Sequence, residues 1–166
     1  MDAIKSNNII QLEEDEDILI FNIYDEKGKD TGETIEFNLE DIGLLLRYQE
    51  MLERDKRNRQ NLQNKMIIID KQQDHKGKKL LSSKQEAQIK AMNEFYKEEI
   101  EIYNMFLGER GVEKLLNGRA VSWTSLEKIS EMIEKQILPK LTINAENIKD
   151  KIVKKYSTKK EDGVIE

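Results

Sequence analysis

The sequence predicts a mainly α (α+β) protein, with an N-terminal β-hairpin, a long antiparallel helical hairpin and a C-terminal helical segment. Two alternating apolar runs, 18–24 and 33–39, flank a Gly-containing loop, which is typical of a β-hairpin. Over most of the remaining chain, apolar residues recur at helical spacing among strong helix formers, and only one Pro interrupts them.

The first strand of the predicted β-hairpin alternates, so that Leu19, Phe21 and Ile23 share one face. A lone hairpin is only marginally stable in water, so we expect it to pack on helices or to pair with another chain. Residues 1–16 contain most of an acidic run and are expected to form a flexible acidic arm, since like charges repel one another. Contact with a basic partner is the alternative for this arm.

The first helix of the helical hairpin is expected to run from about Leu39 to about Lys71, with Asn38 as its N-cap. Its stretch 53–61 contains no apolar residue and is expected to project into solvent. Other residues recur at helical spacing and are expected to face a core: Leu39, Ile42, Leu45, Leu46 and Leu52.

The second helix is expected from about Lys84 to Leu107. A Ser-x-x-Glu capping box at 83–86 marks its start, and Gly108 is placed to cap its end. Because its first part is as polar as the facing part of the first helix, the two predict a hairpin that is apolar at its base and polar along its arm. Its apolar stripe comprises Ile89, Met92, Tyr96, Tyr103 and Phe106.

The C-terminal segment is expected to start at a second capping box, TSLE at 124–127, and Pro139 should end or kink the helix that follows. Asn144 is then expected to cap a last helix. Chain length favours one domain. Residues 17–157 are therefore expected to form a single helical domain with its N-terminal β-hairpin, followed by a disordered tail, 158–166.

Composition narrows the classes of function. The net charge of −5 repels phosphate backbones, so nucleic-acid binding would need a local basic patch. The absence of Cys excludes disulfides and thiolate zinc sites. The longest aliphatic runs fall far short of the roughly 20 residues that span a bilayer, and the N-terminus has no signal-peptide pattern. We expect a cytoplasmic protein with no nucleic-acid or membrane partner.

No catalytic, cofactor-binding or metal-binding constellation is recognisable in the sequence. His75 is the only His and lies in a charged turn without the further ligands that a metal site needs. Acidic residues are so frequent that no single pair indicates acid–base catalysis. We therefore expect a protein that is not an enzyme and has no cofactor. The one basic cluster is expected to be a solvated helix face or, alternatively, a site of phosphate contact. It comprises Arg54, Lys56, Arg57 and Arg59.

Candidate partner-binding residues are apolar. Four consecutive apolar residues on a helix point in every direction, so one neighbouring helix cannot bury them all. They are expected to cluster with a Leu pair at the far end of the helical hairpin, either buried there or in an oligomer, or exposed as a docking patch. A Trp before the third helix is expected to be a core anchor or an interface residue. The full set is Met66, Ile67, Ile68, Ile69, Leu80, Leu81 and Trp123.

Residues 106–118, FLGERGVEKLLNG, carry a family resemblance. They combine a Phe–Gly turn with a short segment that ends in an apolar pair and Gly, and a capped helix then leads to Ile-x-Pro at 137–139. With the flanking helices, this pattern resembles the tail assembly chaperones of long-tailed (siphovirus-type) phages and prophages. The resemblance extends loosely over 18–156 and more closely over 103–156.

The resemblance implies a cytoplasmic, non-enzymatic assembly factor. Such chaperones bind the tape-measure protein and help recruit tail-tube subunits during tail morphogenesis, and a homo-oligomer is a further expectation. Two alternatives stay open: a structural or adaptor protein of a virion or bacterial complex, and a nucleic-acid-binding regulator.

Overall fold

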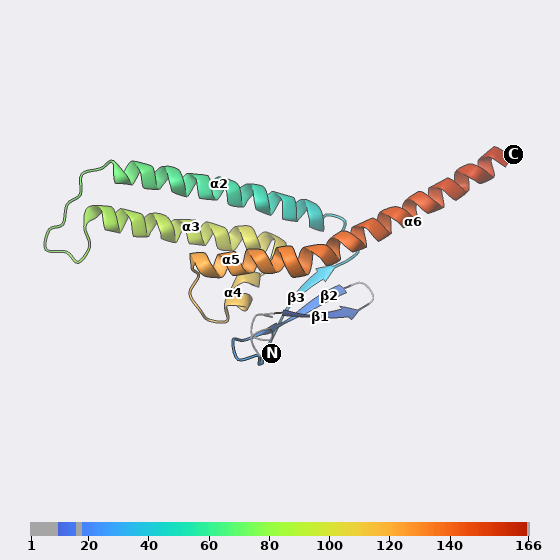
Figure 1. Cartoon of the computed structure of the whole chain (residues 1–166), viewed down its shortest axis with the longest axis horizontal. Coiled ribbons are helices and arrows are strands. Elements are labelled where there is room, and N and C mark those ends of the chain that lie inside the picture. Colours follow the sequence, from blue (N-terminus) through green and yellow to red (C-terminus); the bar gives the residue numbers. More distant parts are fainter. Residues whose placement is uncertain (1–9, 16–17, 166) are drawn as a thin grey trace.

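The computed structural model describes residues 10–15 and 18–165. Figure 1 shows α2 and α3 side by side as a long arm, the sheet near the base of that arm, and α6 projecting away from the rest of the chain. The mainly α (α+β) class is confirmed. The elements are β1 (Ile10–Asp15), β2 (Ile18–Tyr24), β3 (Asp30–Asn38), α2 (Leu44–Asp70), α3 (Ser83–Leu107), α4 (Gly111–Leu116), α5 (Trp123–Met132), the π-helical turn η1 (Ile133–Ile137) and α6 (Leu138–Ile165).

The predicted β-hairpin is confirmed as β2 and β3, which pair antiparallel with Phe21 opposite Ile35. The predicted alternation is confirmed, and the structure decides which face turns inward: Leu19, Phe21 and Ile23 are all buried. The hairpin packs on helices, as its marginal stability in isolation requires. Phe37 of β3 lies against Phe106 of α3, with ring centroids 5.2 Å apart.

The prediction of a flexible arm at residues 1–16 is wrong for residues 10–15, which form β1. β1 pairs antiparallel with β2, and Ile10, opposite Ile23, is buried. Backbone hydrogen bonds do not depend on side-chain charge, so an acidic segment can serve as an edge strand. Residues 1–9 and 16, which hold the rest of the predicted arm, lie outside the described residues, as do residues 17 and 166.

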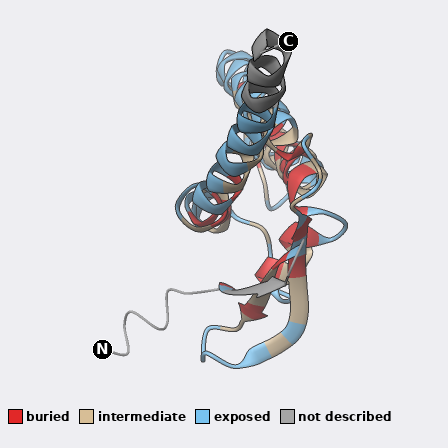
Figure 2. Cartoon of the chain, turned by 90° about the vertical axis from the view of Figure 1, so that its right-hand side faces the viewer, coloured by how far each residue is buried: buried red, intermediate tan, exposed pale blue. Residues whose placement is uncertain are grey.

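The core lies where the sheet meets the helices, and α6 is largely exposed between residues 142 and 155 (Figure 2). Tyr48 of α2 packs on the Phe106 ring, with centroids 5.4 Å apart, so both helices of the arm reach the sheet layer. The middle of the C-terminal segment closes the core with side chains that are at most 1% exposed, namely Leu126, Ile133 and Ile137.

α2 begins later than expected, after turns made by two side chains. The Asn38 Oδ1 accepts from the Glu40 backbone N–H at 3.0 Å, and the Asp41 Oδ1 accepts from the Gly43 N–H at 2.9 Å. Short polar side chains that bond to nearby backbone favour turns over helix. Asn38 is therefore not the N-cap of α2, which is Gly43.

The prediction of the residues that face the core near the start of α2 is correct for Leu39 and Leu45, which are partly buried against the core, and wrong for the other three. Ile42, Leu46 and Leu52 are 85%, 69% and 45% exposed. The inward positions instead recur every three or four residues through a polar middle section, and they are Leu44, Tyr48, Met51, Asp55, Asn58 and Leu62. The spacing of apolar residues predicted the wrong face of α2 because two of its inward positions, Asp55 and Asn58, are polar.

Both predicted capping boxes are displaced by one or two residues. Ser82, rather than Ser83, caps α3: its Oγ accepts from the Gln85 N–H at 3.2 Å, and the Gln85 side chain accepts from the Ser82 N–H at 3.0 Å. Ser122, rather than Thr124, caps α5 in the same way. The predicted cap at Gly108 is confirmed, with φ +95, a conformation that glycine adopts without steric cost.

Pro139 does not end the helix. α5 passes into α6 through η1, where the Leu138 N–H bonds to the Ile133 carbonyl, and Figure 1 shows α6 leaving at an angle to α5. A single π-helical turn of this kind can occur inside an otherwise continuous α-helix. Asn144 is therefore no cap, and its Nδ2 donates to the Leu39 carbonyl at 3.0 Å. The tail expected to be disordered, 158–166, is helical as far as Ile165.

Candidate functional site

The outer end of the helical hairpin exposes apolar side chains. Ile67 and Ile68, in the last turns of α2, are 47% and 59% exposed, and Leu80, in the connecting loop, is 88% exposed. Ile69 is buried, and Met66 and Leu81 are half-buried, so the predicted cluster is divided between packing and exposure. We call Ile67, Ile68 and Leu80 the tip patch.

Trp123, the seventh predicted residue, lies away from the tip patch, at the start of α5, where it packs on the middle of α3 and stays 39% exposed rather than entering the core. Its ring stacks on Phe95 at 5.8 Å between centroids, and the Arg59 guanidinium lies 4.7 Å from the ring centroid. Its Nε1 donates to Glu127 Oε1 at 2.8 Å. With a cation and an aromatic ring both against it, Trp123 anchors the start of α5 to the helical hairpin.

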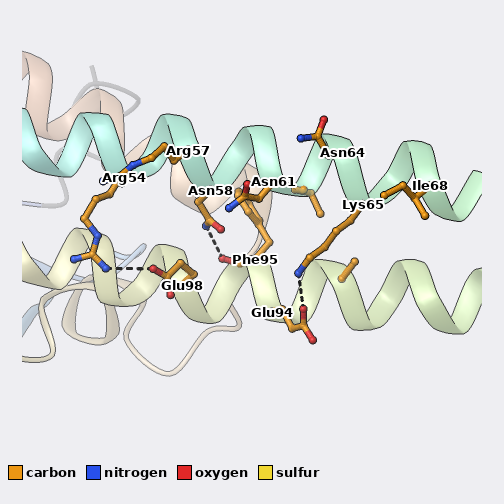
Figure 3. Close-up of a pocket in the computed structure, with 12 residues that line it drawn as sticks. Arg54, Arg57, Asn58, Asn61, Asn64, Lys65, Ile68, Glu94, Phe95 and Glu98 are labelled. Carbon is orange, nitrogen blue, oxygen red and sulfur yellow. Dashed lines mark hydrogen bonds and ion pairs between the residues drawn. The ribbon is translucent and has the colours of Figure 1, made fainter.

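A shallow polar groove of about 630 Å³ runs between α2 and α3 (Figure 3). Arg54 pairs with Glu98 at 3.2 Å, and Lys65 pairs with Glu94 at 2.8 Å. The Lys65 ammonium lowers the pKa of the Glu94 carboxyl through its hydrogen bond. Two ion pairs therefore join the helices across the groove. Because they are exposed, they stabilise the helical hairpin only modestly.

The stretch 53–61 was expected to project into solvent, and this is wrong for its inward face. Asn58 Nδ2 donates to the Phe95 carbonyl at 3.2 Å and to Glu99 Oε1 at 3.1 Å. Arg59 donates to both carboxylate oxygens of Asp55 at 3.1 Å. Two cations of the predicted basic cluster, Arg54 and Arg59, thus already have acidic partners.

Glu99 is the one charged residue among the described side chains that is completely buried. It belongs to a polar layer made of Asp55, Asn58, Arg59 and Glu99, which crosses the centre of the helical hairpin. Burial, reinforced by the hydrogen bond and the negative charge of Asp55, raises the pKa of Glu99 from 4.5 to about 8. The Glu99 Oε2 has no hydrogen-bond partner, and a buried charged oxygen without a partner is costly, which fits the neutral form of this carboxyl.

The polar layer continues toward α5 through Tyr103. Burial and the nearby Asp55 charge raise the pKa of Tyr103 to about 12, while a hydrogen bond with Ser130 acts in the opposite direction. The Tyr103 hydroxyl is therefore neutral and serves as a structural link between α3 and α5. Sequence reasoning missed this polar layer. The signal that could have revealed it was the presence of polar residues at inward helical positions, Asp55 and Asn58 on α2 and Glu99 on α3.

A second groove, of about 310 Å³, lies where α6 leaves the body beside the start of α2. Ile42 lines one wall, and Ile152 and Val153, which are 61% and 54% exposed, line the other. The rest of the lining is mainly aliphatic. We call this the α2–α6 groove; its residues are Leu39, Asp41, Ile42, Leu44, Leu45, Leu141, Asn144, Ala145, Ile148, Lys149, Ile152 and Val153.

Sequence reasoning placed Ile42 in the core and therefore missed the α2–α6 groove. The recurrence of Ile148, Ile152 and Val153 beyond any predicted partner was the signal that pointed to an open apolar face.

His75 lies in the loop between α2 and α3, where its backbone N–H donates to the Ser83 Oγ at 2.9 Å. Within 10–15 and 18–165, no three His, Cys, Asp or Glu side chains are grouped so that they could hold a metal ion. Across the same part of the chain, none of the helices has both the length and the apolar character needed to cross a bilayer.

Comparison with known proteins adds no relative, since no protein-family model, curated protein or solved structure matches this chain.

Proposed function

We propose that this chain is a phage or prophage tail assembly chaperone, a cytoplasmic protein without catalytic activity that binds the tape-measure protein and helps recruit tail-tube subunits. The observation that carries the proposal is the tip patch: large aliphatic side chains stand in solvent at the end of a long helical arm. Exposed apolar patches on soluble domains mark surfaces that bind other proteins.

The arm suits a helical client. Ile67 and Ile68 lie on the last turns of α2 and Leu80 on the adjoining loop, and exposed aliphatic side chains of this kind suit contact with the apolar face of an amphipathic helix. Each aliphatic side chain that such contact buries contributes roughly 1.5–3 kcal/mol. The ion pairs and the polar layer hold the arm together behind this surface, so client binding needs no refolding of the hairpin.

Catalysis is less well supported than binding. The carboxyl with the most altered pKa, Glu99, is sealed inside the helical hairpin, where no substrate can reach it. The carboxylates of the polar groove, Glu94 and Glu98, are held in ion pairs with basic side chains. Nucleic-acid binding is weakened in the same way, because Arg54 and Arg59 are already paired with acidic partners.

The test is capture of the tape-measure and tail-tube proteins encoded beside this gene by the full-length chain. The variant carrying Ile68→Glu and Leu80→Glu should reduce tape-measure capture by at least about tenfold, since two apolar contacts become charged. Ile143→Glu is the matched control: Ile143 lies on α6 and, at 58%, is as exposed as Ile68 at 59%. Failure of the wild-type chain to bind either protein, or equal losses in both variants, would contradict the proposal.

A structural or adaptor protein of the particle would present the same kind of surface. Mass spectrometry of purified particles separates the two functions, because a chaperone leaves the assembled tail and an adaptor stays in it.

A further inference from the structure

Two segments of opposite formal charge border the α2–α6 groove. Between 138 and 155, α6 carries five lysines against two acidic residues, a formal charge of +3. Residues 39–53, at the start of α2, carry four acidic residues against one arginine, a formal charge of −3. Of these charged residues, Asp41, which pairs with Arg47, and Lys149 line the groove itself. The two segments are therefore complementary in formal charge, and each exposes an aliphatic side chain along the groove, Ile42 on one and Ile152 on the other.

Within one chain, only the base of α6 uses this complementarity. Asn144 bonds to the Leu39 carbonyl and Leu141 is 3% exposed, but farther along α6 the side chains of Ile152 and Val153 stand largely in solvent. The aliphatic positions Leu141, Ala145, Ile148 and Ile152 follow four-three-four spacing, which places them in one stripe suited to packing against another helix.

We propose that a second copy of this chain occupies the groove, with α6 of each copy lying along the start of α2 of the other. A two-fold axis lets the same patch serve both subunits, so that the pairing of a basic α6 with an acidic α2 segment occurs twice in the assembly. The stripe at Ile148 and Ile152 then packs near Ile42 of the other copy. This surface is separate from the tip patch, and the dimer does not depend on the proposed chaperone function.

Light scattering coupled to gel filtration, across a concentration series of the full chain, gives the first test. Wild-type protein should be a dimer. Ile152→Glu should weaken the dimer by at least about a hundredfold, because both copies lose a buried isoleucine and each loss costs roughly tenfold or more. Ile143→Glu is the matched control: Ile143, 58% exposed against 61% for Ile152, lies on the same helix outside the groove and should leave the dimer intact.

Cross-linking tests the arrangement itself, because the chain contains no Cys. Two single-cysteine proteins, Ile42→Cys and Ile152→Cys, are mixed and treated with a flexible bismaleimide. Cross-linked heterodimers should form from this mixture and should be scarce when Ile143→Cys replaces Ile152→Cys.

Three results would overturn the proposal. A wild-type chain that stays monomeric at every concentration excludes the dimer, and so does an Ile152→Glu variant that dimerises normally. Cross-linking of Ile152→Cys to itself but never to Ile42→Cys would mean that α6 pairs only with α6. Loss of tape-measure capture by Ile152→Glu in a monomeric wild-type background would assign the groove to the client instead.

Discussion

Replacing Glu99 with Gln tests whether the buried carboxyl of the polar layer is held in its neutral form. Glu99 is completely buried, Asn58 donates to its Oε1 at 3.1 Å, and the neighbouring Asp55 carboxylate favours a proton on Glu99. Gln has the same shape and offers an N–H where the protonated acid offers an O–H. The substitution therefore keeps the hydrogen bonds and removes the proton that can be lost.

The size and sign of the effect on stability follow from the pKa of Glu99, which rises from 4.5 to about 8 on folding. Below pH 4.5 both the folded and the unfolded chain carry the proton, so the stability associated with this site is fully present. As pH rises toward 8, the unfolded chain releases the proton and the folded chain keeps it, so wild-type stability falls by about 1.4 kcal/mol per pH unit. By about pH 7 the loss is on the order of 3 kcal/mol.

Urea unfolding followed by far-UV circular dichroism, at about pH 5 and about pH 7, measures this effect. Titrating groups that do not contact Glu99 are common to the two proteins and cancel in the difference. The Glu99→Gln variant should gain about 2–3 kcal/mol relative to wild type between these two pH values. A difference in unfolding free energy that stays constant with pH would refute the neutral carboxyl, and a lower slope of unfolding against urea would show that the substitution had changed the fold.

Three further substitutions test the packing by urea unfolding or fluorescence. Gly111→Ala should destabilise the fold by about 1–3 kcal/mol, because its new Cβ would lie 2.5 Å from the Leu107 Cβ. Gly77→Ala is the control: no atom lies within 4 Å of its new Cβ, so stability should change by less than about 0.5 kcal/mol. Leu126→Ala should cost about 3 kcal/mol, because Leu126 is fully buried. Arg59→Ala should shift the emission of the single Trp, Trp123, to longer wavelength, since it uncovers the ring; unchanged emission would contradict the contact.

Local signals predicted the elements well. Alternation over 18–24 and 33–39 identified the β-hairpin, and the Gly at position 108 marked the end of α3. Helix starts were less accurate, because several Ser, Thr, Asn and Asp side chains compete to cap one helix and differ little in energy. The same competition explains why Asn38 and Asp41 form turns before α2.

The sequence by itself determined the class of the fold, the order of its main elements and the presence of surplus aliphatic side chains near Ile67 and Leu80, because these depend on residue type and on spacing along the chain. Only the tertiary structure decided which face of α2 is buried. Pattern reading assumes that inward positions are apolar, yet Asp55 and Asn58 occupy inward positions, where Asn58 donates to Glu99 across the helical hairpin and Asp55 pairs with Arg59. With that face turned in, Ile42 is left outside, and the α2–α6 groove exists as a result.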